Sequence, residues 1–144
     1  MMCFSCKKND DKFVKEWQSK KIIIPHTAYL NIKSDHTFEY KDSGCQWRGN
    51  SFGNWKVIND TLILNSVPSK DCKFINGFGN NFRMVKPGVY SKPEVTIKGC
   101  NPTNSDDEYV TFTNDKFYIK NDTLEYVTNI KFLFNDRIAF FKRK

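Results

Sequence analysis

The residues of this chain best suited to metal binding or nucleophilic catalysis are five cysteines and two histidines. Only Cys3 and Cys6 form a Cys-x-x-Cys pair, and no second pair completes a zinc site. His26 follows a proline, and His36 falls in a predicted turn beside a single aspartate, so neither belongs to a recognisable nucleophile–base pair. The sequence therefore predicts no metal, no cofactor and no cysteine or histidine catalysis.

Carboxylates could support a different chemistry, the acid–base hydrolysis of a glycosidic bond. The candidates are Glu39, Asp42 and Glu94, but nothing in their spacing singles out two that would face one substrate. We therefore predict that the protein is not an enzyme and has no catalytic residues.

Residues 53–66 contain the clearest structural pattern, two short strands that reverse at Asn59-Asp60. Apolar and polar residues alternate on both sides of this dipeptide, from Trp55 before it to Leu64 after it, as in half-buried strands. Asn and Asp both tolerate the left-handed backbone that a tight hairpin turn needs. This stretch is therefore predicted to be a β-hairpin.

The same turn pattern recurs along the chain and predicts an antiparallel sheet. Further copies lie at residues 34–35, 114–115, 121–122 and 135–136, each followed by a strand-like run. Aromatic residues make up 15% of the chain, and they suit a pleated, half-buried surface. We predict an all-β, up-and-down meander of about eight to ten strands that closes into a small barrel.

Three segments are predicted to depart from regular strands. Residues 12–21 carry apolar side chains at helical spacing, which indicates a short helix or a strap packed against the barrel mouth. Residues 42–53 and 67–93 are interrupted by Gly, Pro and Asn and are predicted to be largely irregular. Loops on a rigid scaffold often carry function, so we place the candidate binding surface here. Its aromatic members are Trp47, Phe52, Phe74, Phe78 and Phe82.

The formal charge of +7 comes from Lys and Arg residues spread over most of the chain. A nucleic-acid-binding protein more often gathers its basic residues on one helix or loop within a recognisable module. We therefore expect no nucleic-acid partner, and we expect a soluble, monomeric surface with some attraction to anionic lipid or polysaccharide.

The first twelve residues differ in character from the rest. Ser5-Cys6 followed by the polar run 7–12 resembles the end of a bacterial lipoprotein signal, in which a small residue precedes the lipidated cysteine. The resemblance implies lipidation at Cys6, a flexible tether over residues 1–12, and a barrel domain over residues 13–144. It places the protein in the bacterial cell envelope, at the outer membrane or in the periplasm. Because no apolar signal segment precedes Cys6, either the natural start lies further upstream, which we expect, or the protein is not exported.

Lipidation at Cys6 would leave three cysteines, Cys45, Cys72 and Cys100, in an oxidising compartment. One disulfide could form among them, with one thiol left over. The pairing Cys72–Cys100 is favoured, since it would close the least regular segment of the chain. The sequence leaves the other pairings open.

The order of parts resembles the lipocalin-like, or calycin-like, small barrels of many bacterial lipoproteins. The residues that carry this resemblance are 35–40 (Asp-His-Thr-Phe-Glu-Tyr), 53–57 (Gly-Asn-Trp-Lys-Val) and 59–64 (Asn-Asp-Thr-Leu-Ile-Leu). The resemblance implies a non-enzymatic envelope protein that binds a small apolar or amphiphilic ligand inside the barrel or across its mouth. The alternative is a protein-interaction barrel, an envelope inhibitor or assembly factor, that acts through the loop region 67–93.

Two short motifs could mark covalent modification. Asp-Thr-Leu at residues 60–62 and 122–124 resembles an O-glycosylation acceptor pattern of exported bacterial proteins, which would place sugars on Thr61 and Thr123. Asn59 and Asn121 also begin formal N-glycosylation patterns. Turn chemistry alone explains the same residues.

Overall fold

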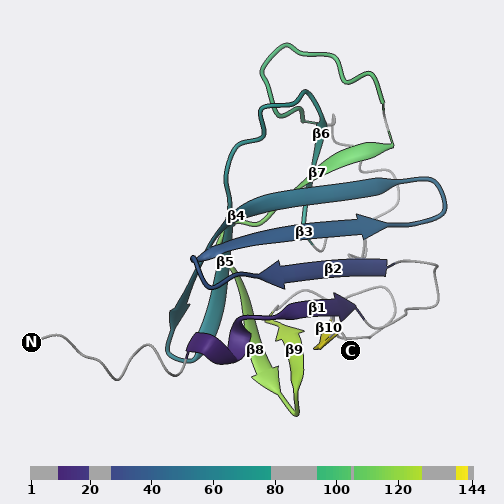
Figure 1. Ribbon diagram of the computed structural model, residues 1–144. Helices are drawn as coiled ribbons and strands as arrows, with labels where there is room; N and C mark the ends of the chain where they lie inside the picture. Colours follow the sequence, from purple (N-terminus) through teal and green to yellow (C-terminus); the bar gives the residue numbers. More distant parts are fainter. Residues whose placement is uncertain (1–9, 20–26, 79–93, 105, 128–138, 143–144) are drawn as a thin grey trace, which may run out of the picture.

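Ten β-strands and one short 3-10 turn make up the described part of the chain (Figure 1). The computed structural model describes residues 10–19, 27–78, 94–104, 106–127 and 139–142. The elements in chain order are η1 (Asp11–Phe13), β1 (Glu16–Ser19), β2 (Thr27–Ile32), β3 (Thr37–Ser43), β4 (Arg48–Ile58), β5 (Thr61–Ser66), β6 (Phe74–Gly77), β7 (Asp107–Thr111), β8 (Asp115–Lys120), β9 (Thr123–Tyr126) and β10 (Ala139–Lys142). The predicted all-β class is confirmed.

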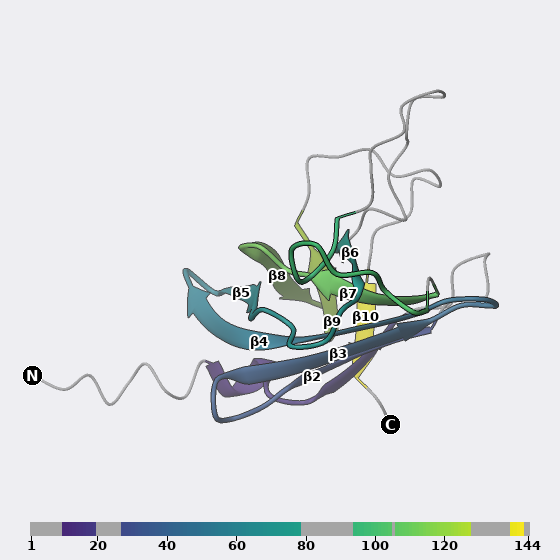
Figure 2. The same ribbon diagram turned by 90° about the horizontal axis from the view of Figure 1, so that it is seen from above.

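The strands form one sheet that curls into a nearly closed barrel. The barrel strands follow the order β3-β2-β1-β10-β9-β8-β5-β4, and β4 pairs back onto β3, while β7 and then β6 continue the sheet beyond β4. All neighbouring strands within the barrel are antiparallel. Seen from above, β2, β3 and β4 lie along one side of the molecule and β8 and β9 along the other (Figure 2). The predicted closure into a small barrel therefore agrees with the strand pairing.

Two of the predicted turns are confirmed as tight hairpins. Asn59 and Asp60, between β4 and β5, have φ angles of 49° and 64°, and Asn121 and Asp122, between β8 and β9, have φ angles of 51° and 59°. Two consecutive left-handed residues are the requirement of a type I′ turn, whose twist matches that of the strands. The Asn-Asp dipeptides therefore determine where these two strand pairs reverse.

The turn predicted at Asn114 and Asp115 is wrong as a hairpin. In the structure β7 pairs in parallel with β4 and β6, whereas β8 pairs with β5 and β9. Only Asn114 is left-handed, with φ 48°, so the chain bends here without reversing. The side chain of Asn65 holds the bend, because its Oδ1 accepts from the Asn114 backbone N at 2.9 Å. The uniform meander is therefore interrupted between β5 and β8, and the turn predicted at residues 135–136 lies outside the described residues.

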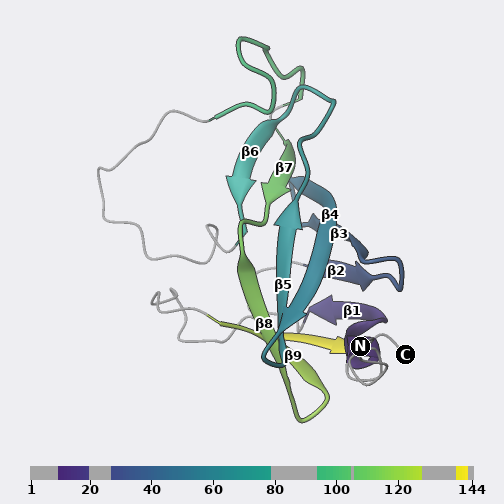
Figure 3. The ribbon, with the colours of Figure 1, turned by 90° about the vertical axis from the view of Figure 1, so that its left-hand side faces the viewer.

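One side of β4 is shared by two strands. Gly53 to Ile58 pair with β5, whereas Arg48 to Asn50 pair with β7, so the sheet forks where β5 ends (Figure 3). The backbone N of Phe112 donates to Ser66 Oγ at 2.9 Å, and Ser66 Oγ lies 2.6 Å from Ser51 Oγ. These hydrogen bonds pair polar groups at the fork, where the regular hydrogen bonding between strands is interrupted.

Residues 42–53 are not the loop that was predicted. β3 continues to Ser43 and β4 already begins at Arg48, which leaves only residues 44–47 between the strands. The glycines of this stretch serve close packing: a Cβ atom on Gly49 would lie 2.1 Å from Asp42 Oδ1, and one on Gly53 would lie 2.0 Å from the carbonyl oxygen of Asn65. Glycine here permits close approach within a strand and does not break it.

The segment before β2 joins the sheet and buries two aromatic side chains. Phe13, at the end of η1, and Trp17, on β1, are 0% and 1% exposed, and the indole N of Trp17 donates to the Phe13 carbonyl at 3.0 Å. No helix beyond the 3-10 turn is present within residues 10–19, because β1 pairs with β2 on one side and β10 on the other. The helical alternative for residues 12–21 is therefore not found there, and β1 is a strand of the barrel sheet, not a strap across the barrel mouth.

Apolar side chains of the described strands pack against one another in the interior of the barrel. Phe78 stacks on Phe112 with ring centres 4.6 Å apart, and Phe117 lies 5.5 Å from Phe78. The buried cluster comprises Phe13, Trp17, Ala28, Leu30, Ile32, Phe38, Tyr40, Trp55, Leu62, Leu64, Phe78, Val110, Phe112, Phe117 and Leu124. Every second residue of β2 and β3 contributes to it, as the alternation of apolar residues predicts.

Candidate functional site

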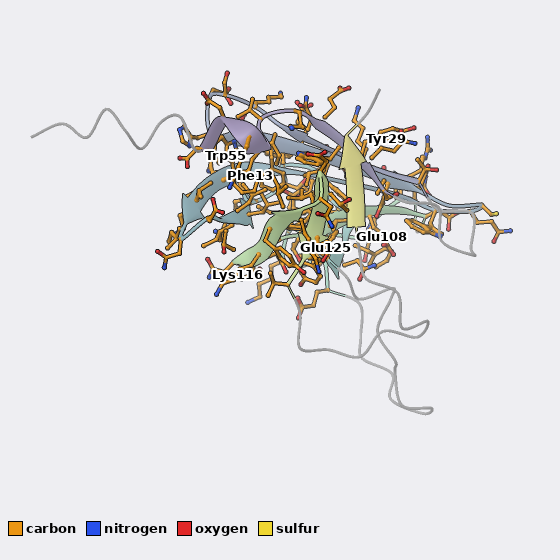
Figure 4. All side chains as sticks on the ribbon, turned by 90° about the horizontal axis from the view of Figure 1, so that it is seen from below. Phe13, Tyr29, Trp55, Glu108, Lys116 and Glu125 are labelled. Atoms are coloured by element: carbon orange, nitrogen blue, oxygen red, sulfur yellow. A yellow bond between two sulfur atoms is a disulfide. The ribbon has the colours of Figure 1, made fainter. Side chains whose placement is uncertain are left out.

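A cleft of about 540 Å³, lined mainly by polar and charged residues, opens on the outside of the barrel, where β3 ends and β4 begins. Figure 4 shows Tyr29 and Glu108 toward this end of the molecule, with Phe13 and Trp55 toward the other. The residues that line the cleft are Thr27, Tyr29, Lys41, Asp42, Ser43, Arg48, Gly49, Asn50, Lys73 and Asp107. We name it the β3–β4 cleft.

Two rows of side chains across β2, β3 and β4 form the wall of the β3–β4 cleft. One row runs from Tyr29 through Lys41 to Asn50, which are register partners. The other runs from Thr27 through Ser43 to Arg48. Directly paired residues lie on the same face of a sheet, and Ala28 and Leu30 take the inner face of β2. The rows therefore project outward, into the cleft.

Lys73 closes the cleft from the side of β6 and β7. Its Nζ donates to Asn50 Oδ1 at 3.0 Å and lies 3.3 Å from Asp107 Oδ1. The Lys73 side chain is only 18% exposed, so this ammonium is held in a largely desolvated position. Its backbone N donates to Thr96 Oγ1 at 2.9 Å, and the neighbouring Cys72 forms a disulfide with Cys100. The side of the cleft formed by Lys73 is therefore tied to the barrel and to the segment around Cys100.

A buried tyrosine supports the inner edge of the cleft. Tyr40 donates its hydroxyl to Asp42 Oδ2 at 2.9 Å. Burial, reinforced by the charge of Asp42, raises the pKa of Tyr40 well above its ordinary value. The hydroxyl therefore remains a proton donor throughout the neutral range and keeps the Asp42 carboxylate turned toward the protein.

The carboxylates considered for glycosidic chemistry are not brought together as a facing pair. Glu39 and Asp42 are three residues apart on β3 and so point to opposite faces. Glu39 forms an ion pair with Lys33 at 2.8 Å, and Glu94 lies beside Val95, which forms an isolated bridge to Phe74. The described geometry therefore offers these residues no shared substrate position.

Two of the predicted binding residues lie near the cleft but outside its lining. The Trp47 indole packs over Gly44, where an added Cβ would lie 2.5 Å from its Nε1. Phe52 points outward from β4 and is 39% exposed, with its ring centre 5.8 Å from that of Tyr109. Trp47 thus belongs to its own short loop, and Phe52 remains an accessible apolar side chain.

The predicted aromatic patch in the irregular region is not formed as expected. Phe78 is 5% exposed and belongs to the core, so its assignment to a binding surface is wrong. The reason is that the chain returns to the barrel after β6, where the Phe78 backbone N donates to the Thr111 carbonyl at 2.9 Å. Phe74 is half-buried at the start of β6, and Phe82 lies outside the described residues.

The structure places the remaining predicted sites as follows. Cys72 and Cys100, the pair favoured from the sequence, are joined with an S–S distance of 2.09 Å, and Cys45 is an exposed free thiol. The hydroxyls of Thr61 and Thr123 each donate to the carbonyl two residues earlier, at 3.4 Å, in the two Asn-Asp hairpins. Cys6 lies outside the described residues.

His36 lies in a turn and packs against an aromatic side chain. It occupies the β2–β3 turn with φ 66°, and its ring stacks on Trp55 with centres 4.4 Å apart. His26 is outside the described residues. Within residues 10–19, 27–78, 94–104, 106–127 and 139–142, no three or more His, Cys, Asp or Glu side chains are grouped as metal ligands would be. In the same ranges no helix is long and apolar enough to span a membrane.

Comparison of the chain with protein-family models, curated proteins and solved structures found no match. The functional assignment therefore depends on the cleft itself. Sequence reasoning missed its main polar residues, Lys41, Asn50 and Lys73. The alternation in β3 could have marked Lys41 as outward-facing, but Lys73 reaches the cleft only through the tertiary fold.

Proposed function

We propose that the protein is a lipocalin-like, non-enzymatic binding module of the bacterial cell envelope, and that it binds a polar ligand in the β3–β4 cleft. The observation that carries this proposal is the contrast between the tightly packed aromatic side chains of the described core and the open cleft. Phe78, Phe112 and Phe117 occupy the middle of the barrel, whereas charged and amide groups line the cleft. This contrast favours the cleft over the interior, where a small apolar ligand would otherwise bind.

The path of the chain supports display of the cleft at a membrane surface. Lys12, just before Phe13, contacts Asp60 in the β4–β5 turn, so the chain enters the fold at the end where β4 finishes. The cleft lies at the start of β4, and an eleven-residue strand spans about 33 Å. A lipid on Cys6 would therefore hold the hairpin end toward the membrane and leave the cleft facing away.

A protein partner is the second candidate, acting through the predicted loop region 67–93. The observation that favours it is the exposure of two large apolar side chains beside this region, Phe52 on β4 at 39% and Ile97 at 43%. The Phe52 carbonyl accepts from the Val67 backbone N, and Thr96, which precedes Ile97, donates its backbone N to the Lys73 carbonyl. Such residues are common anchors at protein interfaces. Residues 79–93 of this region lie outside the described residues.

We expect a polar ligand to perturb the cleft and not the core. In a titration of ¹⁵N-labelled protein followed by NMR, polar probes (glucose, maltotriose, trigalacturonate and inorganic phosphate) are compared with the uncharged apolar probe N-phenyl-1-naphthylamine. Saturable amide shifts at Lys41, Asn50 and Lys73 with at least one polar probe would support the proposal. Saturable shifts at Phe112 and Leu124 with the apolar probe alone would move the binding site into the barrel.

The lipid anchor is tested by intact mass. The protein expressed from its full genomic locus and taken from the membrane fraction should begin at Cys6 and carry the added mass of acyl chains. The Cys6→Ser variant should lose the acyl mass and leave the membrane fraction, whereas Cys45→Ser should keep both. An unlipidated wild-type product that begins at Met1 would contradict the anchor.

A further inference from the structure

The charged groups of the β3–β4 cleft are not balanced. Asp107 is paired with Lys73, and the Asp42 carboxylate accepts from the buried Tyr40. In the part of the chain that the structure describes, neither Lys41 nor Arg48 takes part in a salt bridge. With Lys73, the lining holds three cations and two carboxylates, a net charge of +1, and Lys41 and Arg48 are the two cations outside any ion pair of the described residues.

The hydrogen-bonding groups of the cleft are mostly donors. The Oδ1 atom of Asn50 already accepts from Lys73, so the amide Nδ2 is the group that this residue offers. Thr27 and Ser43 add hydroxyls in the row that ends at Arg48. Arg48 itself has a planar fork that fits a carboxylate through two parallel bonds. A ligand rich in acceptors, with a negative group, matches this set.

One aromatic side chain completes the wall. Tyr29 is 37% exposed and is the register partner of Lys41. A half-exposed tyrosine ring offers an apolar face with a polar tip, the combination that suits a ring bearing both C–H and hydroxyl groups. The volume of about 540 Å³ lies within the range of small-molecule sites and exceeds what a lone inorganic anion needs.

We infer that the ligand of the β3–β4 cleft is an acidic saccharide, with a sugar carboxylate bound by Arg48 and Lys41 and a sugar ring packed on Tyr29. This inference rests on the proposed function and names its ligand class. The net charge of +7 draws polyanions to the protein in general, and the cleft adds the selection for a carboxylate-bearing sugar.

The test compares trigalacturonate with its fully methyl-esterified form, which has the same rings without charge. By isothermal titration at 50 mM NaCl, esterification should weaken binding about tenfold or more. Lys41→Ala and Arg48→Ala should each weaken binding of the acid about five- to tenfold and leave binding of the ester nearly unchanged. Tyr29→Ala should weaken both forms about threefold to tenfold.

Lys56→Ala is the matched control, because Lys56 is an exposed lysine on the outward face of β4 at the opposite end from Arg48. It should change the affinity for trigalacturonate by less than about twofold. Equal binding of acid and ester, equal losses in Lys56→Ala and Lys41→Ala, or inorganic phosphate binding as tightly as trigalacturonate would overturn the inference. Cleft shifts with maltotriose but not with trigalacturonate would overturn it and leave the proposed function standing, whereas no saturable shift with any polar probe would remove both.

Discussion

Replacing Phe112 with alanine is expected to lower the free energy of unfolding by about 4 kcal/mol, because removal of this large buried side chain would leave a cavity that the surrounding residues fill only in part. Phe112 is 2% exposed, and its ring centre lies 5.3 Å from Phe38, 5.2 Å from Tyr40 and 4.6 Å from Phe78. It therefore joins β3, the end of β6 and the β7–β8 connection. Urea unfolding at 25 °C, followed by tryptophan fluorescence, measures the change.

Phe52→Ala is the matched control for this experiment. It deletes the same atoms from a side chain that is 39% exposed and packs mainly against Tyr109. We expect a loss of about 1 kcal/mol, because less apolar surface returns to water and no closed cavity forms. Similar losses for Phe52→Ala and Phe112→Ala would contradict the assignment of Phe112 to the centre of the core.

The hairpins could be predicted because their information is local. A type I′ turn requires two adjacent left-handed residues, and Asn59-Asp60 and Asn121-Asp122 supply both. Asn114 has the same kind of sequence context but a different outcome. Its bend depends on the side chain of Asn65, 49 residues away, which no local pattern reveals.

The error over residues 42–53 has a similar cause. Glycine is common both in loops and where two backbones come close together, and the sequence does not distinguish these uses. Gly49 lies under the Asp42 carboxylate and Gly53 against the Asn65 carbonyl. The partners across the sheet, and not the neighbours in the chain, decide that both glycines belong to β4.

The candidate site could be predicted least well, because its residues come from five separate segments. Aromatic residues in irregular sequence suggested a surface, yet Phe78 completes the core and Trp47 packs on its own loop. The polar residues that line the cleft, such as Asn50 and Lys73, are unremarkable in the sequence. The preference for the Cys72–Cys100 pair is the one sequence-based inference that points toward the cleft, because Lys73 follows Cys72 directly.

Removing the disulfide in a Cys72→Ser/Cys100→Ser double variant should lower the free energy of unfolding by about 3 kcal/mol. The bond spans 28 residues, and a cross-link of that length restricts the unfolded chain by about this amount. The effect should also reach the cleft, because Lys73 follows Cys72 directly and loses the covalent restraint beside it. Urea unfolding measures the first effect, and the NMR shifts of Asn50 and Lys41 measure the second.

Two further variants separate these effects. Cys45→Ser replaces an exposed free thiol and should leave both the stability and the cleft shifts unchanged. Lys73→Met keeps the disulfide and most of the side-chain volume but removes the ammonium that holds Asn50 and Asp107. If the disulfide acts on the cleft through Lys73, Lys73→Met should reproduce the shift changes at Asn50 while costing less stability than the loss of the disulfide. Unchanged Asn50 shifts in both the double variant and Lys73→Met would show that the barrel wall alone sets the cleft geometry.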